Sequence, residues 1–320
     1  MVFSLAPMAA LSHAGLRRLI DDFLAPDEYF SEMIHAPSLI SGNQFEKWYL
    51  RACPTPEKLV WQITTPNQNA GVKAIPMLLE NGGMGVDLNM GCCAPQIVNQ
   101  GAGFGWMLKP VLETANYVKA IKSEIIKFSN TQPVRLSVKI RLGQSEDYNF
   151  LLSFCKILVG EGVDLITLHP RLQRQSYLQP AKHKYINMLS KDINIPVYGN
   201  GDIDSYTKFE NTKEKIQCTG WMIGRSAVQK PWIFYELKNK QPPHNIDLLQ
   251  VVIKFLDYLE AEQPPEFQKT RRQRFFAYFA NNFKFAHYLK NRLLKAKNRS
   301  EIMQEFTDYF SQSPSEQFLK

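Results

Sequence analysis

Residues 134–169 read VRLSVKIRLGQSEDYNFLLSFCKILVGEGVDLITLH, and the organisation of the whole chain can be worked out from this stretch. It starts with a β-rich run at residues 134–141, continues with a helical pattern at 149–162 and ends with a second β-rich run at 164–169. A strand, a helix and a second strand in this order predict a right-handed βαβ unit with parallel strands.

The same unit recurs along most of the chain. Further stretches with helical periodicity lie at residues 13–24, 73–82 and 113–128. Eight parallel strands that alternate with helices close naturally into a barrel, so we expect the α/β class and a (β/α)₈ TIM barrel, with a doubly wound sheet as the alternative. The eight β-rich runs are residues 3–8, 28–33, 59–64, 85–89, 134–141, 164–169, 196–201 and 221–225.

The repeats stop near Trp232, and the remaining chain has a different pattern. A Pro-rich linker, KNKQPPHN at residues 238–245, is followed by a helical pattern that runs to the end of the chain and is divided by Pro264 and Pro265. We therefore expect a barrel domain at residues 1–240 and a smaller all-helical domain at residues 241–320.

The composition is that of a globular protein with a large core. The chain has 320 residues, of which 44% are hydrophobic, enough for a barrel and an appendage. Its five cysteines form no C-x-x-C pair and are odd in number, which argues against a disulfide framework and a metal site. The start lacks a basic leader and no apolar run approaches about 20 residues, so we expect a cytoplasmic protein without membrane contact. We also expect a monomer.

The net charge of +8 is concentrated in one segment. Residues 266–299 contain ten basic residues and one acidic residue, a net charge of +9, and the basic residues are interleaved with aromatic ones. This pattern suits a helical surface that contacts phosphates while its aromatic face packs inward, although an ordinary solvated helix face is the alternative. The aromatic residues are Phe275, Phe276, Tyr278, Phe279, Phe283 and Tyr288.

Polar and glycine residues gather where the predicted strands end. In parallel barrels the carboxyl ends of the strands form the face that carries the active site, so these residues are expected to meet at one mouth. They are Pro7, Met8, Gln62, Asn89, Lys139, Arg141, His169, Asn200, Gly201, Asp202, Gly224 and Arg225.

Two turns after the last two strands are candidates for binding phosphate. YGNGD provides Gly201, and MIGRSA provides Gly224 and the forked guanidinium of Arg225, so backbone and side chain can both approach phosphate oxygens. Lys139 is costly to bury without an anionic or electron-rich partner, and a reduced flavin offers one at its pyrimidine edge. His169 ends the neighbouring strand, so both can reach one ligand.

The segment NMGCCAP follows the fourth strand and contains two adjacent cysteines. An unperturbed thiol has a pKa of about 8.5, so it keeps its proton at neutral pH and can act as a general acid without an activating base. A nucleophile, a metal ligand and a small buried residue remain alternative roles for either cysteine.

A series of motifs in the first 235 residues resembles the tRNA-dihydrouridine synthases. The basic helical tail corresponds to the tRNA-binding domain of that family by position and composition. The motifs are APM at residues 6–8, VDLNMGC at 86–92, VNQGAG at 98–103, SVKIRLG at 137–143, LHPR at 168–171, GNGD at 199–202 and MIGR-x₅-PWIF at 222–234.

The resemblance implies a reaction in which NADPH reduces bound FMN, flavin N5 delivers hydride to uracil C6, and a cysteine protonates C5. Cys92 matches the family's proton donor, with Cys93 as the alternative. Asn89, Arg171 and Tyr177 would hold the base, and Arg271, Arg272 and Arg274 would contact tRNA. FMN would be bound by Pro7, Met8, Gln62, Lys139, His169, Asn200, Gly201, Asp202, Gly224 and Arg225, with Lys139 and His169 also counted as catalytic.

Three departures from the family pattern concern the geometry around the donor. Cys93 replaces the proline of G-C-P, HPRL replaces HGRT, and the bulky Phe104 and Trp106 stand where small residues are common. The segment WYLRACPTPEKLVWQ and the GVDLN spelling resemble the bacterial branch that acts on uridine 16. A dihydroorotate-dehydrogenase-like enzyme acting on a free pyrimidine and a tRNA-binding protein without catalysis are the alternatives.

Overall fold

The computed structural model describes residues 1–128 and 133–319, and eight of its parallel strands close into a barrel. β1 pairs with both β2 and β9, and β2 also pairs with β4, so the ring has no open edge. The barrel is confirmed, and the doubly wound sheet is wrong because such a sheet would leave two free edges. The strands are β1 (Val2–Leu5), β2 (Glu28–Phe30), β4 (Leu59–Thr64), β5 (Gly85–Met90), β6 (Arg135–Gly143), β7 (Leu165–Leu172), β8 (Val197–Asn200) and β9 (Gly220–Ile223).

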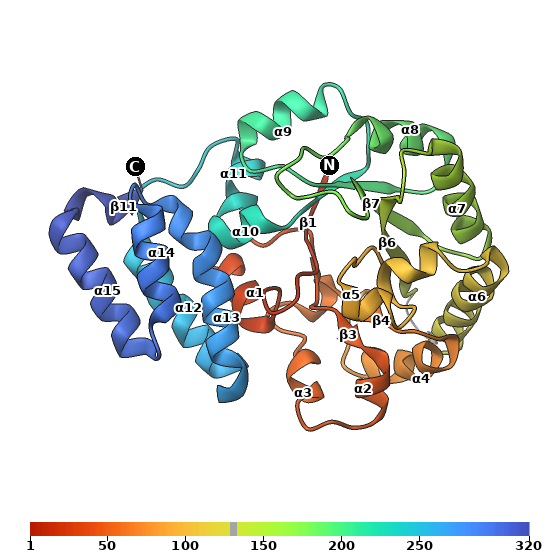
Figure 1. The fold of residues 1–320 in the computed structure, drawn as a ribbon, viewed down its shortest axis with the longest axis horizontal. Coiled ribbons are helices and arrows are strands. Elements are labelled where there is room, and N and C mark those ends of the chain that lie inside the picture. Colours follow the sequence, from red (N-terminus) through yellow and green to blue (C-terminus); the bar gives the residue numbers. More distant parts are fainter. Residues whose placement is uncertain (129–132, 320) are drawn as a thin grey trace.

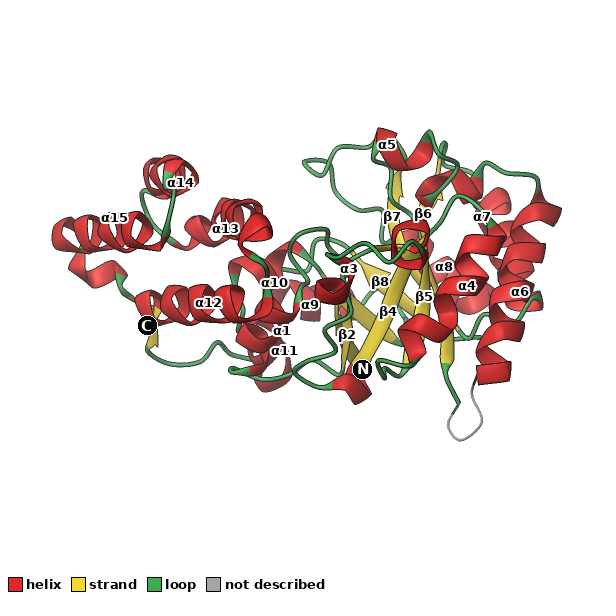
Figure 2. Ribbon diagram, turned by 90° about the horizontal axis from the view of Figure 1, so that it is seen from below, coloured by secondary structure: helices red, strands yellow, loops and turns green. Residues whose placement is uncertain are grey.

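Helices surround the barrel, and Figures 1 and 2 show them around the strands. This explains why the strands are rich in apolar residues, since both of their faces are buried. β3 (Ile34–His35) adds a short pairing to the end of β4. The surrounding helices are α1 (Ala14–Asp21), α2 (Ala36–Ile40), α3 (Glu46–Tyr49), α4 (Gln68–Leu79), α5 (Pro95–Val98), α6 (Val111–Phe128), α7 (Tyr148–Gly160), α8 (Lys184–Asp192), α9 (Tyr206–Lys213), α10 (Arg225–Gln229) and α11 (Ile233–Asn239).

Several helices begin where the sequence provides a capping side chain. Asn67, Asp147 and Ser205 each accept a hydrogen bond from a backbone N–H in the first turn of α4, α7 and α9, respectively. Such caps satisfy donors that have no partner inside the helix and contribute about 1 kcal/mol each. Each of these caps lies in the connection that follows a strand, so the local sequence specifies where the chain turns from strand to helix.

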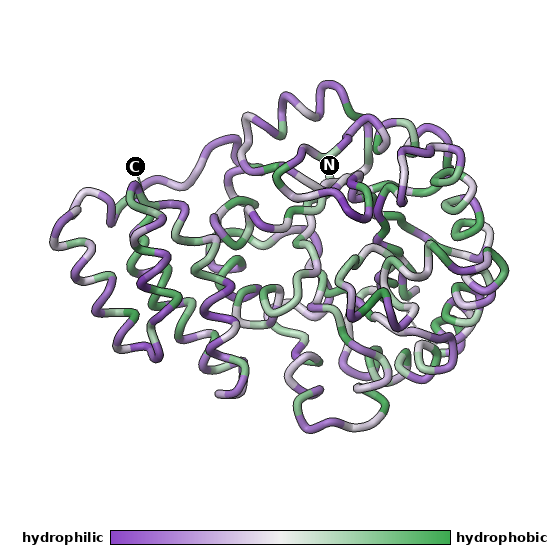
Figure 3. Tube along the Cα trace, in the orientation of Figure 1, coloured by the Kyte–Doolittle hydropathy of each residue, from purple (hydrophilic) through white to green (hydrophobic). Residues whose placement is uncertain are grey.

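Four helices follow the barrel: α12 (Leu248–Glu262), α13 (Pro265–Phe279), α14 (Ala286–Lys295) and α15 (Arg299–Gln312). Pro264 and Pro265 separate α12 from α13, as their position in the sequence predicted. Phe275 stacks on Phe255 of α12 at 3.6 Å between ring centroids, and the alternating hydropathy along these helices in Figure 3 reflects this packed inner side. A two-stranded ladder of β10 (Ile246–Asp247) and β11 (Phe318–Leu319) joins the ends of the segment.

The four helices contact the barrel where α12 packs on α1 and where α13 packs on α10. A Cβ placed on Gly15 would lie 2.9 Å from the Tyr258 carbonyl oxygen, so glycine permits this close approach of the two helices. Asp22 accepts hydrogen bonds from Lys254 and Tyr258 across the same contact.

The division of the chain into two domains at residues 240 and 241 stays a prediction, and residue 320 lies outside the described residues. None of the helices in the described ranges is both long enough and apolar enough to cross a bilayer.

Candidate active site

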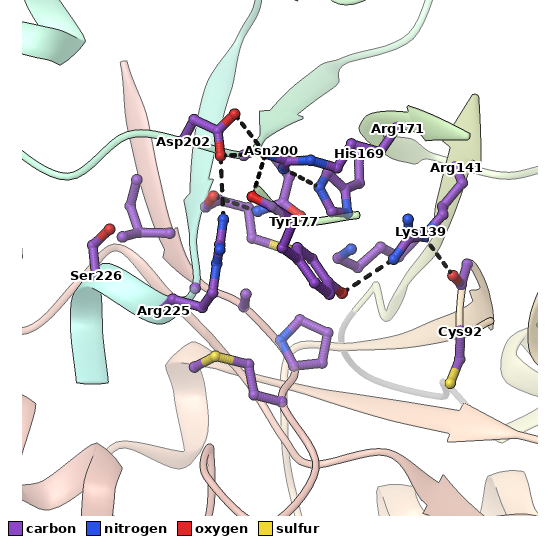
Figure 4. A pocket seen from close by; sticks show the side chains of 18 of the residues that line it. Cys92, Lys139, Arg141, His169, Arg171, Tyr177, Asn200, Asp202, Arg225 and Ser226 are labelled. Atoms are coloured by element: carbon purple, nitrogen blue, oxygen red, sulfur yellow. Dashed lines mark hydrogen bonds and ion pairs between the residues drawn. The ribbon is translucent and has the colours of Figure 1, made fainter. Parts of the chain in front are cut away.

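One large cavity of about 1020 Å³ opens at the mouth of the barrel, at the carboxyl ends of its strands. All of the site residues predicted from the sequence line it, except Arg271 and Arg272. Figure 4 shows Asp202 and Arg225 at one side of this cavity and Cys92 at the other, with Tyr177 and Lys139 between them. The topology therefore brings together residues that lie more than 200 positions apart in the chain.

The turn after β8 is built around backbone conformations that favour glycine. Gly201 has φ +123°, and a Cβ there would lie 3.3 Å from both His169 and Arg171. Asp202 follows with φ 60° and forms ion pairs with Arg171 at 2.6 Å and with Arg225 at 3.2 Å. Burial by itself would raise the pKa of Asp202, but the hydrogen bonds from Arg171 and the Ala181 amide lower it below the ordinary value. Asp202 thus orients Arg225, the half-buried cation of the predicted phosphate site.

Asn200 and His183 fix the same turn from its two sides. The Asn200 amide donates to the Met222 carbonyl at 2.7 Å, which ties the end of β8 to β9. The Nε2 atom of His183 lies 2.9 Å from the Gly201 carbonyl oxygen. His183 was missed from the sequence because it precedes a helix and does not end a strand.

Lys139 and His169 meet in the cavity from adjacent strands. Among the described residues, none forms a hydrogen bond or an ion pair with the Lys139 ammonium, and burial together with Arg141 lowers its pKa to about 8. His169 is buried, and burial followed by the nearby cations lowers its pKa far below the ordinary value, so the ring is neutral. Its Nε2 lies 2.9 Å from the Arg171 guanidinium, which assigns the ring proton to Nδ1.

The turn after β5 carries Cys92 and is anchored by two contacts. The Asn89 side-chain oxygen accepts hydrogen bonds from the Cys92 amide at 2.9 Å and the Gly91 amide at 3.2 Å. Behind the turn, Gly103 has φ +57°, and a Cβ there would lie 2.7 Å from the Cys92 carbonyl oxygen. Phe104 donates its backbone N–H to that carbonyl at 2.9 Å. Cys92 therefore sits on a turn that is supported on both sides.

The two cysteines differ in their surroundings. The Cys93 thiol lies 3.4 Å from the Gly91 carbonyl, and burial raises its pKa. For the Cys92 thiol, no hydrogen bond within the described ranges is found, and it faces the same cavity as Lys139. This geometry supports Cys92 as the donor, although both thiols line the cavity.

The predicted base-binding role of Arg171 is not supported by its position. Its side chain is 1% exposed, and its donors bind the Gln179 carbonyl, His169 and Asp202. The guanidinium is thus used by the protein itself, and it holds the 173–180 loop against the end of β7. Tyr177 of that loop is 53% exposed and stacks on His169 with ring centroids 5.9 Å apart.

Arg141 was expected at the mouth without an assigned role, and it contributes to the site. It donates to the Gly91 carbonyl at 3.2 Å, the Leu172 carbonyl at 3.2 Å and the Tyr177 hydroxyl at 3.1 Å. It thereby connects the cysteine turn with the 173–180 loop. The signal was present, because Arg141 lies two residues after Lys139 at the mouth end of β6 and therefore on the same face.

The bulky residues near the cysteine turn do not intrude into the cavity. Trp106 is buried, stacks on Tyr117 at 4.2 Å between ring centroids and donates its indole N–H to the Thr65 carbonyl. Phe104 is buried in the main core. The two large side chains fill space behind the turn, on the side away from the mouth.

The proline of the HPRL segment, Pro170, continues β7. Its carbonyl accepts a hydrogen bond from the Lys182 amide.

The three arginines of α13 point to three different environments, which corrects the expectation of one basic surface. Arg271 is 3% exposed and forms an ion pair with Glu32 of the β2–β3 connection at 2.8 Å, so it is a buried link to the barrel. Arg272 is partly buried and donates to the Lys297 carbonyl. Arg274 is exposed and lines the cavity.

The rest of the basic segment is also divided. Arg292 pairs with Glu305, and Arg299 pairs with Asp257 and Glu260. The aromatic residues mostly pack inward as predicted, since Phe275, Phe276, Phe279 and Phe283 are buried, but Tyr278 lines the cavity and Tyr288 is exposed. The exposed cations of residues 266–299 are Lys269, Arg274, Lys284, Arg292, Lys295 and Lys297.

The donor set of the cavity fits a flavin with a terminal phosphate. Lys139 is a partly buried cation with no partner among the residues that the structure describes, as expected of a side chain that binds an electron-rich ring. Arg225 at the other side is oriented by Asp202, next to Gly224, where a Cβ would meet nothing closer than 3.6 Å. The backbone at Gly224 is thus open to close approach by a ligand.

Comparisons with known proteins agree with this arrangement. The family model described as "Dihydrouridine synthase (Dus)" matches residues 4–318. A probable tRNA-dihydrouridine synthase of Aquifex aeolicus is 28% identical over 239 residues, covering 74% of this chain and 72% of that protein. A probable tRNA-dihydrouridine synthase of Helicobacter pylori strain J99 is 28% identical over 313 residues, covering 94% and 90% of the two chains.

Solved structures show the same fold at low sequence identity. A 2-naphthoyl-CoA reductase in complex with 2-naphthoyl-CoA superposes with a TM-score of 0.56 at 11% identity, over 75% of this chain and 50% of that larger one. Such a likeness shows the fold alone. Because the family model spans nearly the whole described chain, the protein is a member of the dihydrouridine synthase family, the flavin-dependent barrel oxidoreductases that act on tRNA.

Proposed function

We propose that this chain reduces a uridine in the D-loop of tRNA to dihydrouridine, with FMN as its bound cofactor and NADPH as the electron donor. The observation that carries the proposal is the cavity in which the Lys139 ammonium, the neutral His169 and the Cys92 thiol meet. When bound, the flavin supplies the hydride that adds to C6 of the uracil ring. The protein must then bind the ring, exclude water and deliver a proton to C5.

Different strand ends are assigned to different parts of the cofactor. Gly224 and Arg225, with the turn of Asn200, Gly201 and Asp202, are assigned to the phosphate. Lys139 stabilises negative charge at one ring edge, and His169 provides a neutral ring that adds no further charge. The ring is also assigned to Pro7, Met8 and Gln62, all of which line the same cavity.

Cys92 is assigned as the proton donor. Its turn is anchored by Asn89 and Gly103, so the thiol has a defined direction towards the cavity. A positioned general acid contributes about 10²- to 10⁴-fold to such a step. We assign the uracil contact to Tyr177, and give Asn89 the role of holding the Cys92 turn and Arg171 that of holding the Tyr177 loop.

The substrate is assigned to tRNA because the cavity lies between the barrel and the helical tail. Arg274, Tyr278 and Asn281 of the tail line the cavity alongside the strand ends. A uridine of a folded RNA must be extruded to enter such a cavity, and the exposed cations of the tail can bind the phosphates around it. We propose uridine 16 as the target, on the resemblance of residues 48–62 and 85–89 to the branch that acts there. We also propose that the protein is cytoplasmic and monomeric.

The proposal is tested with the purified protein. The expected preparation is yellow, releases FMN on denaturation, and is bleached by NADPH. The reduced protein should be reoxidised anaerobically by tRNA that lacks dihydrouridine, and not by free uridine at the same concentration. Efficient turnover of a free pyrimidine would remove the tRNA assignment, and a colourless protein that does not take up FMN would remove the flavin chemistry.

A further inference from the structure

A line of buried hydrogen bonds runs from the core of the barrel to the cysteine turn. Gln62, Asp87 and Ser137 lie at one level of the barrel, paired across β4, β5 and β6. Asp87 is fully buried and accepts from the Ser137 hydroxyl at 2.6 Å and from the Gln62 amide at 2.7 Å. Gln62 in turn accepts from the Asn89 amide at 2.9 Å, and Asn89 accepts from the Cys92 backbone N–H.

The direction of this line is set at Asp87. An ionised carboxylate only accepts hydrogen bonds, whereas an amide side chain can present either its oxygen or its NH₂ group. Gln62 must therefore turn its NH₂ group to Asp87, which leaves its oxygen for Asn89. Asn89 must then turn its NH₂ group to Gln62, and only its oxygen remains for the amides of Gly91 and Cys92.

We propose that Asp87 is a positioning residue that fixes the turn of Cys92 through the side-chain orientations of Gln62 and Asn89. The inference rests on the proposed function, in which Cys92 delivers a proton to the substrate. Asp87 touches neither the cavity nor the thiol, since it is absent from the residues that line the cavity. Its role is to stabilise the one amide arrangement in which the Asn89 oxygen faces the Gly91 and Cys92 amides, which also need an acceptor.

The experiment compares three variants by hydrogen exchange and by single-turnover kinetics of the FMN-loaded protein. In D87N the residue can donate or accept, so Gln62 can turn its oxygen to position 87, and the Asn89 side chain is then held only from the side of the Cys92 turn. We expect amide exchange at Gly91 and Cys92 to accelerate about 10-fold. We also expect reoxidation by tRNA to slow by about 10- to 100-fold, as for a misplaced reacting group. Reduction by NADPH should change by less than about threefold, because the thiol takes no part in it.

The matched control is S137A. It removes the hydrogen bond of Asp87 that points away from Cys92 and leaves the carboxylate in place to orient Gln62. Its exchange at Gly91 and Cys92 should match that of the unmodified protein. Equal acceleration in S137A and D87N would overturn the proposal, because it would show only a general loosening of the barrel.

The double variant D87N/N89D provides a rescue that a merely structural role does not predict. The amide introduced at position 87 could donate to the Gln62 oxygen, and Gln62 could then donate to the carboxylate introduced at position 89. That carboxylate would still accept from the Gly91 and Cys92 amides. Slow exchange at these amides should therefore return, even if D87N alone fails to fold. Fast exchange or misfolding in the double variant contradicts the proposal. The exchange measurement needs no turnover, so it tests the role of Asp87 even if the unmodified protein does not reduce uridine.

Discussion

The barrel mouth and helix α13 both carry clustered cations, yet they use them differently. At the mouth, Lys139 has no partner within residues 1–128 and 133–319 and Arg225 is only half-buried, so both can face a ligand. On α13, Arg271 is committed to a buried ion pair with Glu32, and Arg274 alone of the three arginines reaches the cavity. The mouth is therefore assigned to the chemistry, whereas α13 serves both as a structural contact and as a binding surface.

The difference follows from the two backbone geometries. Successive side chains of a strand alternate between two faces, so Lys139 and Arg141 must lie on one face of β6. Successive side chains of a helix are rotated by about 100°, so Arg271, Arg272 and Arg274 cannot all face one ligand. A run of charges on a helix thus needs its neighbours in space before a role can be assigned.

The largest expected effect concerns the mouth. Cys92→Ala should slow reoxidation of the reduced protein by tRNA at least about 100-fold, because a positioned general acid is removed. Reduction by NADPH should be unchanged. Stopped-flow measurement of flavin absorbance separates the two steps.

Cys93→Ala is the matched control, since it removes the neighbouring thiol from the same turn. Its reoxidation rate should stay within about threefold of the unmodified protein. If Cys93→Ala abolishes dihydrouridine formation and Cys92→Ala does not, the donor assignment is wrong.

The second effect tests the buried contact between α13 and the barrel. Arg271→Met leaves Glu32 buried without its cation, and breaking one partner of a buried ion pair costs about 3 to 5 kcal/mol. Glu32 also accepts the Ala10 amide at 2.6 Å, next to the Pro7 and Met8 loop, so flavin content should fall as well. Thermal unfolding and FMN content measure both effects.

Adding Glu32→Gln to Arg271→Met should recover part of the lost stability, because the unpaired charge is then removed. Arg272→Met on the same helix serves as the control, with a loss of about 1 kcal/mol for one hydrogen bond to a carbonyl. Equal losses in the Arg271 and Arg272 variants would show that the two arginines do not differ as described.

The third effect concerns a buried acid below the mouth. Burial raises the pKa of Asp87 to about 6. Hydrogen bonds from Gln62 and Ser137 and the positive charges of Lys139 and Arg135 on β6 oppose this rise. Tyr117 of α6 is the other titratable group near it. The folded state therefore binds a proton more tightly than the unfolded state. The stability contribution of this group falls as pH rises from about 4 to about 6 and is constant above that.

Urea denaturation across this pH range measures the free energy of unfolding of the unmodified protein and of D87N, and the two values are subtracted. Subtraction removes the groups that titrate in both proteins. The difference should change by up to about 3 kcal/mol, from a shift of about two pKa units. A difference that does not vary between pH 4 and 6 contradicts the assigned shift.

The smallest effect tests whether the exposed side of α13 binds tRNA. Arg274→Ala should leave thermal stability within about 0.5 kcal/mol, because the side chain is exposed. Its tRNA affinity should fall, and the slope of log affinity against log salt should decrease in magnitude by about 1 for the loss of one phosphate contact. An unchanged slope would show that Arg274 does not contact a phosphate. Fluorescence anisotropy at several salt concentrations gives the slope, and flavin content should not change.

The fold and the composition of the mouth could be predicted because strand periodicity and parallel topology dictate them. Gln62, Asn89, Lys139 and His169 were placed correctly in one cavity on these grounds alone. Arg171 could not be assigned from its position, because its partner Asp202 lies 31 residues away and the choice between ligand and ion pair depends on burial.

Burial on α13 could not be predicted either. Glu32 is 239 residues from Arg271, and nothing in the local sequence of either indicates their pairing. The same is true of His183, whose contact with the Gly201 carbonyl depends on how the loop before α8 folds back. Roles that depend on such long-range partners became visible only in the packed structure.

Mapping dihydrouridine in tRNA from cells that lack this protein, and from the same cells supplied with it again, is the most direct measurement of what the mouth does. We predict loss of dihydrouridine at D-loop position 16 alone, and its return with the unmodified protein but not with Cys92→Ala. An unchanged dihydrouridine pattern in the cells that lack the protein would contradict the assignment of a tRNA uridine to this cavity.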